Sequence, residues 1–214
     1  MKIKHHLSDE LLMAYAAAEL PEAFNLVVAA HLSLCDECRA RSMAFDALGG
    51  AVIEDSTCDM AQGSLDACLA RISGISQIDV TPPRRSDSVL PAPLLDYVGG
   101  SLEATKWRSL GMGVRQSILQ TGDKGASARL LYIPAGAAMP DHGHRGLELT
   151  LVLQGAFRDE VDRFGRGDVE IADASVEHTP VAEAGEPCIC LAATQGSLKF
   201  NALLPRLAQP FFRI

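Results

Sequence analysis

The chain has 214 residues, of which 48% are hydrophobic and 21% charged, enough apolar material for one large domain or two modest ones. Its formal net charge of −8 argues against direct binding to nucleic acid, because phosphate backbones attract basic surfaces. No apolar run approaches the roughly 20 residues that a membrane helix needs. The first residues lack the apolar core of a signal peptide, so we expect a cytoplasmic protein.

The first third of the chain has the apolar spacing of four short helices. We expect Ser8 to cap the first helix and Pro21 to open the second. The third helix should follow Cys38 and stop at Gly49-Gly50, and Ser64 should cap the fourth. This predicts an all-α domain in which no single helix can bury much surface alone.

A candidate metal-binding site lies where the second predicted helix ends. His31, Cys35 and Cys38 form the pattern His-x3-Cys-x2-Cys. On a helix this spacing places all three side chains on one face, on consecutive turns. An imidazole and two thiolates suit zinc, and the fourth ligand would be His5 or His6. We prefer His6 because it adjoins the cap of the first helix. The alternative is that the two cysteines are ordinary buried thiols.

The composition changes between residues 73 and 93, where proline, serine and arginine are frequent. Such a stretch is typical of an extended, solvated linker. We therefore predict two domains: residues 1–85, which include the linker from about residue 73, and residues 94–214.

From about Trp107 onward the hydrophobic pattern has a period of two, in short runs between glycine-rich turns. Evenly spaced short strands predict an all-β sandwich or barrel. The expected strands are 114–119, 129–133, 147–154, 169–171, 189–193 and 198–203.

A second candidate metal site lies in the β region. The sequence from 136 to 155 resembles the first motif of the cupin family, G-x5-H-x-H-x3-E-x6-G, at every specified position. Those positions are Gly136, His142, His144, Glu148 and Gly155. Because His142 and His144 are two residues apart on an extended segment, they point to the same face. Two imidazoles and a carboxylate suit a divalent transition metal such as zinc, manganese or iron.

The second cupin motif is less well matched. Gly167 begins it, and His178 lies where the third histidine ligand belongs. Asp173, Ser175 and Ala182 replace the usual proline, glycine and asparagine. With three histidines and a glutamate, zinc would be coordinatively complete, whereas iron or manganese would keep open positions. The motif therefore predicts a cupin-like barrel (jelly roll) without identifying its metal.

The remaining cysteines have two interpretations. Cys188 and Cys190 are two apart on a predicted strand, so both sulfurs face the same side. They are either small core residues or a redox-responsive pair near the cupin metal. We interpret Cys58 and Cys68 as structural or incidental.

A helical domain with a metal-binding site, followed by a linker and a cupin-like domain, resembles the ChrR-type zinc-binding anti-sigma factors. The resemblance covers essentially the whole chain. The stretches HLSLCDECRAR, PDHGHRGLELTLVLQGAFRDE and FFRI carry the resemblance. It implies that the helical domain binds one extracytoplasmic-function sigma factor of the sigma-E class, in a 1:1 complex, and lodges between its two domains. The cupin-like domain would be dispensable for inhibition but required for release under singlet oxygen or related oxidative stress.

The resemblance also implies two zinc sites. The helical zinc would be held by His6, His31, Cys35 and Cys38. The cupin-like zinc would be held by His142, His144, Glu148 and His178. The protein would then be a regulator and not an enzyme, with no direct nucleic-acid or membrane partner.

The residues themselves are compatible with a regulator. An apolar face spread over several helices offers a surface for a partner, and an acidic chain complements a basic, DNA-binding protein. The flexible linker would let the two domains move relative to each other. The alternative is a metal-dependent cupin enzyme such as a dioxygenase, which predicts turnover of a small molecule with iron or manganese bound.

Overall fold

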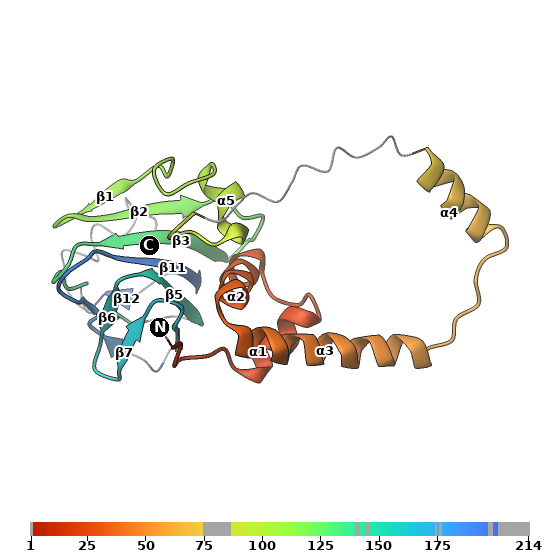
Figure 1. Cartoon of the computed structure of the whole chain (residues 1–214), viewed down its shortest axis with the longest axis horizontal. Helices are drawn as coiled ribbons and strands as arrows, with labels where there is room; N and C mark the ends of the chain where they lie inside the picture. Colours follow the sequence, from red (N-terminus) through yellow and green to blue (C-terminus); the bar gives the residue numbers. More distant parts are fainter. Residues whose placement is uncertain are drawn as a thin grey trace.

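The computed structural model describes residues 2–74, 87–139, 142–143, 146–173, 175, 177–196 and 199–200, with the side chains of 142, 177, 199 and 200 excepted. A helical part and a β part lie side by side, and one helix stands apart from both (Figure 1). The predicted combination of an N-terminal helical region and a C-terminal β region is confirmed. Among the described helices, none has both the length and the apolar character needed to cross a bilayer.

Five helices occur in the described residues. They are α1 (Asp9–Ala16), α2 (Glu22–Leu34), α3 (Asp36–Asp55), α4 (Ser64–Ser73) and α5 (Ala92–Val98). As predicted, Ser8 caps α1, because its hydroxyl accepts a hydrogen bond from the Leu11 N–H at 3.3 Å. Helix α2 begins one residue later than predicted, at Glu22, and Pro21 occupies its N-cap and not its first turn.

The predicted end of the third helix at Gly49-Gly50 is wrong. Helix α3 continues through both glycines to Asp55. Glycine in a helix costs only about 1 kcal/mol relative to alanine, and the segment from Ala51 onward consists of residues that tolerate a helix. The helical residues on both sides of the two glycines therefore outweigh their cost, and the helix continues through them.

Two further helix predictions need correction. Ser64 is the first residue of α4 and not its cap, since Gly63 occupies the cap with a φ of 79°. Helix α5 was not predicted, because Pro91-Ala92-Pro93 resembles a linker. Proline is well accommodated in the first turn of a helix, where its missing N–H has no partner to lose. The predicted linker itself falls largely on residues 75–86, which lie outside the described residues.

The strands form three antiparallel sheets. The six-stranded sheet has the order β1-β2-β3-β11-β5-β8, and two smaller sheets have the orders β10-β6-β7 and β12-β4-β9. The large sheet consists of β1 (Arg108–Gly111), β2 (Val114–Leu119), β3 (Ala126–Ile133), β5 (Glu148–Gln154), β8 (Val169–Ala172) and β11 (Cys188–Gln195). The small sheets consist of β4 (His142–Gly143), β6 (Ala156–Arg158), β7 (Arg163–Gly165), β9 (Glu177–His178), β10 (Val181–Ala182) and β12 (Lys199–Phe200).

Five of the six predicted strands occur with small shifts at their ends. The sixth, predicted at 198–203, overlaps β12, and the residues from 201 onward, FFRI included, lie outside the described residues. Strand β1 and, apart from β12, the strands of two or three residues were not predicted, because such short segments have too few residues to establish a period of two.

The large sheet has an apolar core on each face. Along β11, Cys188 and Cys190 face the small sheets, where they pack with Phe157 and Phe164. The alternate residues, such as Leu191, face the helices. The barrel interior and the interface with the helices are therefore built from the same strands.

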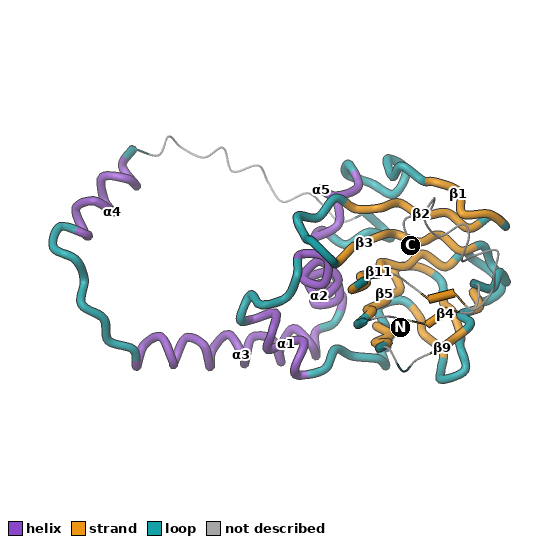
Figure 2. Tube along the Cα trace, turned by 180° about the vertical axis from the view of Figure 1, so that it is seen from behind, coloured by secondary structure: helices purple, strands orange, loops and turns teal. Residues whose placement is uncertain are grey.

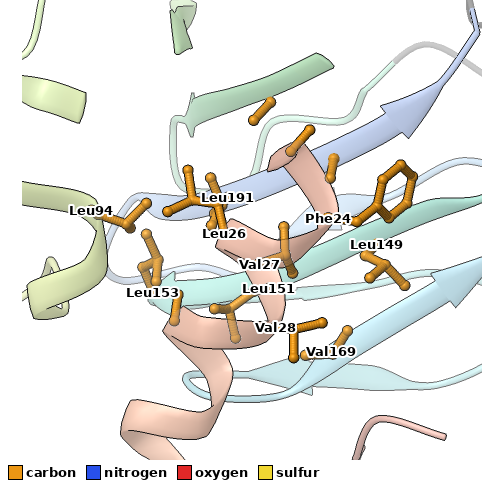
Figure 3. Close-up of a cluster of buried hydrophobic side chains, with 14 of the residues drawn as sticks. Phe24, Leu26, Val27, Val28, Leu94, Leu149, Leu151, Leu153, Val169 and Leu191 are labelled. Carbon is orange, nitrogen blue, oxygen red and sulfur yellow. The ribbon is translucent and has the colours of Figure 1, made fainter. Parts of the chain in front are cut away.

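Helix α2 lies directly on the large sheet (Figure 3). Its Phe24, Val27 and Val28 pack against Leu149, Leu151 and other residues of the strands. Asp123, in the turn before β3, binds the first turn of α2 by accepting from the N–H groups of Glu22 at 2.9 Å and Ala23 at 2.7 Å. Helix α2 therefore shares one core with the β part.

We expect Leu151→Ala to lower the free energy of unfolding by about 2–5 kcal/mol. Leu151 is fully buried between α2 and the sheet, so truncation leaves a cavity at the interface. Denaturant unfolding measures the change. The control is Val161→Ala at an exposed apolar position, with an expected change within about 0.5 kcal/mol. Equal losses in both variants would contradict a shared core.

Candidate metal centres

His31 lies in the last turn of α2 and is fully buried. Its Nδ1 is 2.9 Å from the carbonyl oxygen of Gly167. Because a carbonyl only accepts, Nδ1 carries the proton and Nε2 presents a lone pair. Among the described residues, this buried Nε2 has no hydrogen-bond partner. Burial lowers the pKa of His31 to about 4, so the ring is neutral at pH 7, as a metal ligand must be.

The sequence spacing predicted that Cys35 and Cys38 continue the helix that carries His31. In the structure they do not. Cys35 has an extended backbone (φ −116°, ψ 105°), ends α2 and caps α3. Its sulfur accepts from the Cys38 N–H at 3.4 Å, which favours a new helix start over continuation. The two sulfurs and His31 therefore converge across a helix–helix junction.

The fourth member of the cluster is His6. Its Nδ1 lies 3.3 Å from the sulfur of Cys35 and 3.5 Å from that of Cys38. The ligand atoms of His6, His31, Cys35 and Cys38 all lie within 4.8 Å of one another. His5 instead faces the β part, with Nε2 at 3.1 Å from an oxygen of Asp162.

These four residues fit a tetrahedral metal. Zinc–ligand bonds of about 2.0–2.3 Å put tetrahedral ligand atoms roughly 3.3–3.8 Å apart, close to the contacts of His6 with the two sulfurs. Burial raises the pKa of the Cys38 thiol to about 11, so a thiolate here needs a cation beside it. The unpartnered Nε2 of His31 supplies a further ligand atom. The donor set and its burial thus support one metal ion in the helical part.

The structure describes only part of the cupin site predicted from the sequence. Glu148 is the first residue of β5 and is buried, and its Oε1 accepts from the Thr150 hydroxyl at 3.2 Å. His178 is buried on β9, and the backbone of His142 on β4 pairs with it directly. The side chain of His142 and the whole of His144 lie outside the described residues.

His178 has carboxylate partners that the sequence analysis missed. Its Nδ1 lies 2.8 Å from an oxygen of Glu170 and 3.4 Å from one of Asp159. These three residues form a second group that could hold a metal ion. Glu170 stands between the apolar residues Val169 and Ile171, where a charged side chain is normally solvent-facing, so no pattern in the sequence indicates that it is buried.

The negative charges around His178 favour the protonated form of its ring. Burial lowers the pKa of His178, but the hydrogen bonds and charges of Glu170 and Asp159 outweigh this and raise it to about 9. With Glu170 ionised, the Nδ1 proton of His178 points to that carboxylate. This is the usual arrangement of a carboxylate that orients a metal-binding histidine.

A buried arginine also lies inside the barrel. Arg129 on β3 is 5% exposed and donates to Gln116 at 3.3 Å and to Ser127 at 3.0 Å. Burial lowers its pKa, and the negative charge of Glu148 opposes that effect. The barrel interior is thus polar and charged on the side of the predicted cupin centre.

Cys188 and Cys190 face the same side of β11, as predicted, and their sulfurs are 3.5 Å apart. Both are buried free thiols. Their mutual hydrogen bond and their burial raise the pKa of Cys190 well above its usual value. The pair is therefore held as thiols in the core between the sheets, which leaves open both interpretations made from the sequence.

Helices α3 and α4 expose an unusual number of apolar side chains and extend away from the rest of the molecule (Figure 2). None of the side chains of α4 is buried. We refer to the exposed apolar residues of these two helices as the α3–α4 apolar surface; they are Met43, Leu48, Val52, Ile53, Leu65, Leu69 and Ile72. Because α3 and α4 lie apart in Figures 1 and 2, this surface consists of two exposed apolar faces, each typical of a segment that binds another protein.

Comparison with known proteins identifies the family. The model of the ChrR cupin-like domain matches residues 98–198. A curated relative, anti-sigma-E factor ChrR from Cereibacter sphaeroides, is 63% identical over 215 residues and covers the whole of both chains. The chain belongs to the ChrR family of anti-sigma-E factors. The predicted resemblance is therefore confirmed.

A solved structure of this family has the same fold. The crystal structure of Rhodobacter sphaeroides SigE in complex with the anti-sigma ChrR matches with a TM-score of 0.79 and 61% identity. The match covers 91% of this chain and 100% of the other. The ChrR-family arrangement of helices and cupin-like sheets therefore extends over most of this chain.

Proposed function

We propose that this chain is an anti-sigma factor that binds a sigma-E-class sigma factor in a 1:1 complex and keeps it from RNA polymerase. The full-length identity of 63% to an anti-sigma-E factor carries this proposal. The α3–α4 apolar surface supports it, because it has no partner among the described residues and would be buried against the sigma factor. Since its partner works on RNA polymerase, the protein acts in the cytoplasm.

The helical metal site holds zinc in this proposal. His6, His31, Cys35 and Cys38 are the ligands, and the metal joins the N-terminal segment to the junction of α2 and α3. A closed structural site of this kind contributes to folding and not to catalysis. The zinc thereby fixes the direction in which α3, with its part of the α3–α4 apolar surface, leaves the helical part.

The cupin-like domain is the sensor in this proposal. His142, His144, Glu148 and His178 hold a second metal ion, zinc, while Glu170 and Asp159 orient His178. Singlet oxygen or a related oxidant acts at this centre, and the sigma factor is then released. Residues 1–85 and 94–214 are the inhibitory and sensing domains, and the sensor is a regulatory and not a catalytic module.

Calorimetric titration of the purified chain with the sigma-E-class factor of the same organism tests the central claim. We expect tight binding of one sigma factor per chain and a loss of sigma-dependent transcription in a reconstituted assay. An absence of binding by the zinc-loaded chain would refute the function. Oxygen consumption by the chain loaded with iron or manganese, in the presence of small-molecule substrates, would instead favour a cupin enzyme.

A further inference from the structure

The turn between β7 and β8, residues 166–168, contacts the helical metal cluster. The carbonyl of Gly167 accepts the Nδ1–H of His31, although the two residues belong to different domains. Gly167 has a φ of 89°, and a Cβ there would lie 2.7 Å from the side chain of Ile3. Only glycine therefore allows the N-terminal segment to lie this close to the turn.

The next residue of the turn, Asp168, holds the segment that carries His6. Its Oδ1 accepts from the N–H groups of Lys4 at 2.6 Å and His5 at 3.0 Å. Its Oδ2 accepts from the Gly165 N–H at 2.8 Å, which closes the turn itself. Asp168 is only 4% exposed, and the Val169 N–H adds a hydrogen bond to the His5 carbonyl at 3.2 Å. The backbone directly before His6 is thus fixed by the cupin-like domain.

These contacts act on two of the four ligands at once. The first residues of a chain are poorly ordered unless they are tied down, and here His6 is tied down through Asp168. A histidine ligand needs a partner on its other nitrogen, and His31 obtains this partner from Gly167. Neither contact comes from the helical part that contains the ligands.

We propose that Asp168 and the Gly167 carbonyl position the ligands of the helical metal site, so that the cupin-like domain sets how long this site keeps its metal. The inference rests on the proposed zinc site of His6, His31, Cys35 and Cys38. Loss of such outer partners typically lowers metal affinity by about 10–100-fold. Asp168 touches no ligand atom and is a positioning residue.

The strand that follows this turn, β8, also contributes to the cupin centre. Glu170, two residues after Asp168 on β8, accepts the Nδ1–H of His178. The two histidines His31 and His178 thus obtain their outer partners from positions 167 and 170 of one short segment. A displacement of Glu170 at the cupin centre would therefore also move Gly167, three residues earlier in the backbone, and with it the hydrogen-bond partner of His31.

The test uses the full chain loaded with Co²⁺. Only the helical site has thiolate ligands, so thiolate-to-cobalt charge-transfer absorption reports that site and not the cupin-like one. We expect Asp168→Ala to lose this absorption to excess EDTA about 10-fold faster than the wild type. Asp168→Asn keeps one acceptor oxygen and should lie between the two.

The matched control is Asp123→Ala. Asp123 also belongs to the β part and also accepts two backbone N–H groups of the helical part, but at the far end of α2 from the metal. We expect Asp123→Ala to lower the thermal midpoint and to release cobalt at the wild-type rate. Equal acceleration in both alanine variants would overturn the inference, because general loosening of the domains would then explain it.

A wild-type release rate in Asp168→Ala, with native circular dichroism, would also overturn the inference. If Asp168→Ala does not fold, the comparison of Asp168→Asn with Asp123→Asn decides in the same way. A wild-type chain without the charge-transfer absorption would refute the proposed zinc site, and the inference with it. A wild-type chain with the absorption, together with unaffected Asp168 variants, would refute the inference alone.

Discussion

Replacing Cys38 with serine is expected to remove one metal ion per chain and to weaken sigma-factor binding by on the order of 100-fold, about 2.7 kcal/mol. Cys38 is fully buried in the first turn of α3, and its sulfur lies 3.5 Å from His6. Without this ligand the metal no longer ties α3 to the N-terminal segment, and the energy of metal binding is lost from folding. Elemental analysis and calorimetric titration with the sigma factor measure the two effects.

The matched control for this substitution is Cys58→Ser. Cys58 is exposed and does not belong to the metal cluster, so its metal content and binding should equal those of the wild type. Full metal content in Cys38→Ser would contradict the proposed ligand set. Lost metal with unchanged binding would show that the zinc does not shape the partner surface.

Leu69→Asp should reduce sigma-factor affinity by at least about 30-fold, or roughly 2 kcal/mol, while leaving the fold intact. Leu69 is an exposed member of the α3–α4 apolar surface, and α4 has no buried side chain. A carboxylate there costs little in the free chain but must be desolvated when the partner covers it. Calorimetry measures the affinity, and thermal unfolding checks the fold.

The control for Leu69→Asp places the same charge elsewhere. Val161, in the turn between β6 and β7, is at least as exposed as Leu69, so Val161→Asp introduces a carboxylate at an apolar position of the sensing part. We expect it to bind the sigma factor like the wild type. Wild-type affinity in Leu69→Asp would exclude α4 from the interface and leave α3 as the remaining apolar candidate.

Local chemistry explains which features could be predicted from the sequence. The residue types and spacing of His31, Cys35 and Cys38 indicate a metal whatever the path of the backbone, because few other arrangements need these donors together. Strand periodicity predicted the main strands of the large sheet, since alternate residues of each strand face opposite cores. Ser8 could be recognised as a cap because its hydrogen-bond partner, the Leu11 N–H, is only three residues away in the sequence.

Features that depend on distant contacts could not be predicted in this way. The path of the N-terminal segment, which places His6 at the metal cluster and His5 against the β part, depends on how Asp168 fixes the backbone. The partners of His178 come from residues 8 and 19 positions away, which no periodicity connects. The seating of α2 on the sheet depends on apolar faces that are complementary only after both parts have folded.

The chain thus encodes its metal ligands and strands locally, since donor type, spacing and alternation act over a few residues. How the two domains meet depends on contacts between residues more than 100 positions apart, such as His31 with Gly167 and Glu22 with Asp123. Each such contact joins a backbone group to a partner that only folding brings near. For that reason the link between the cupin-like turn and the helical metal site became visible in the structure and not in the sequence.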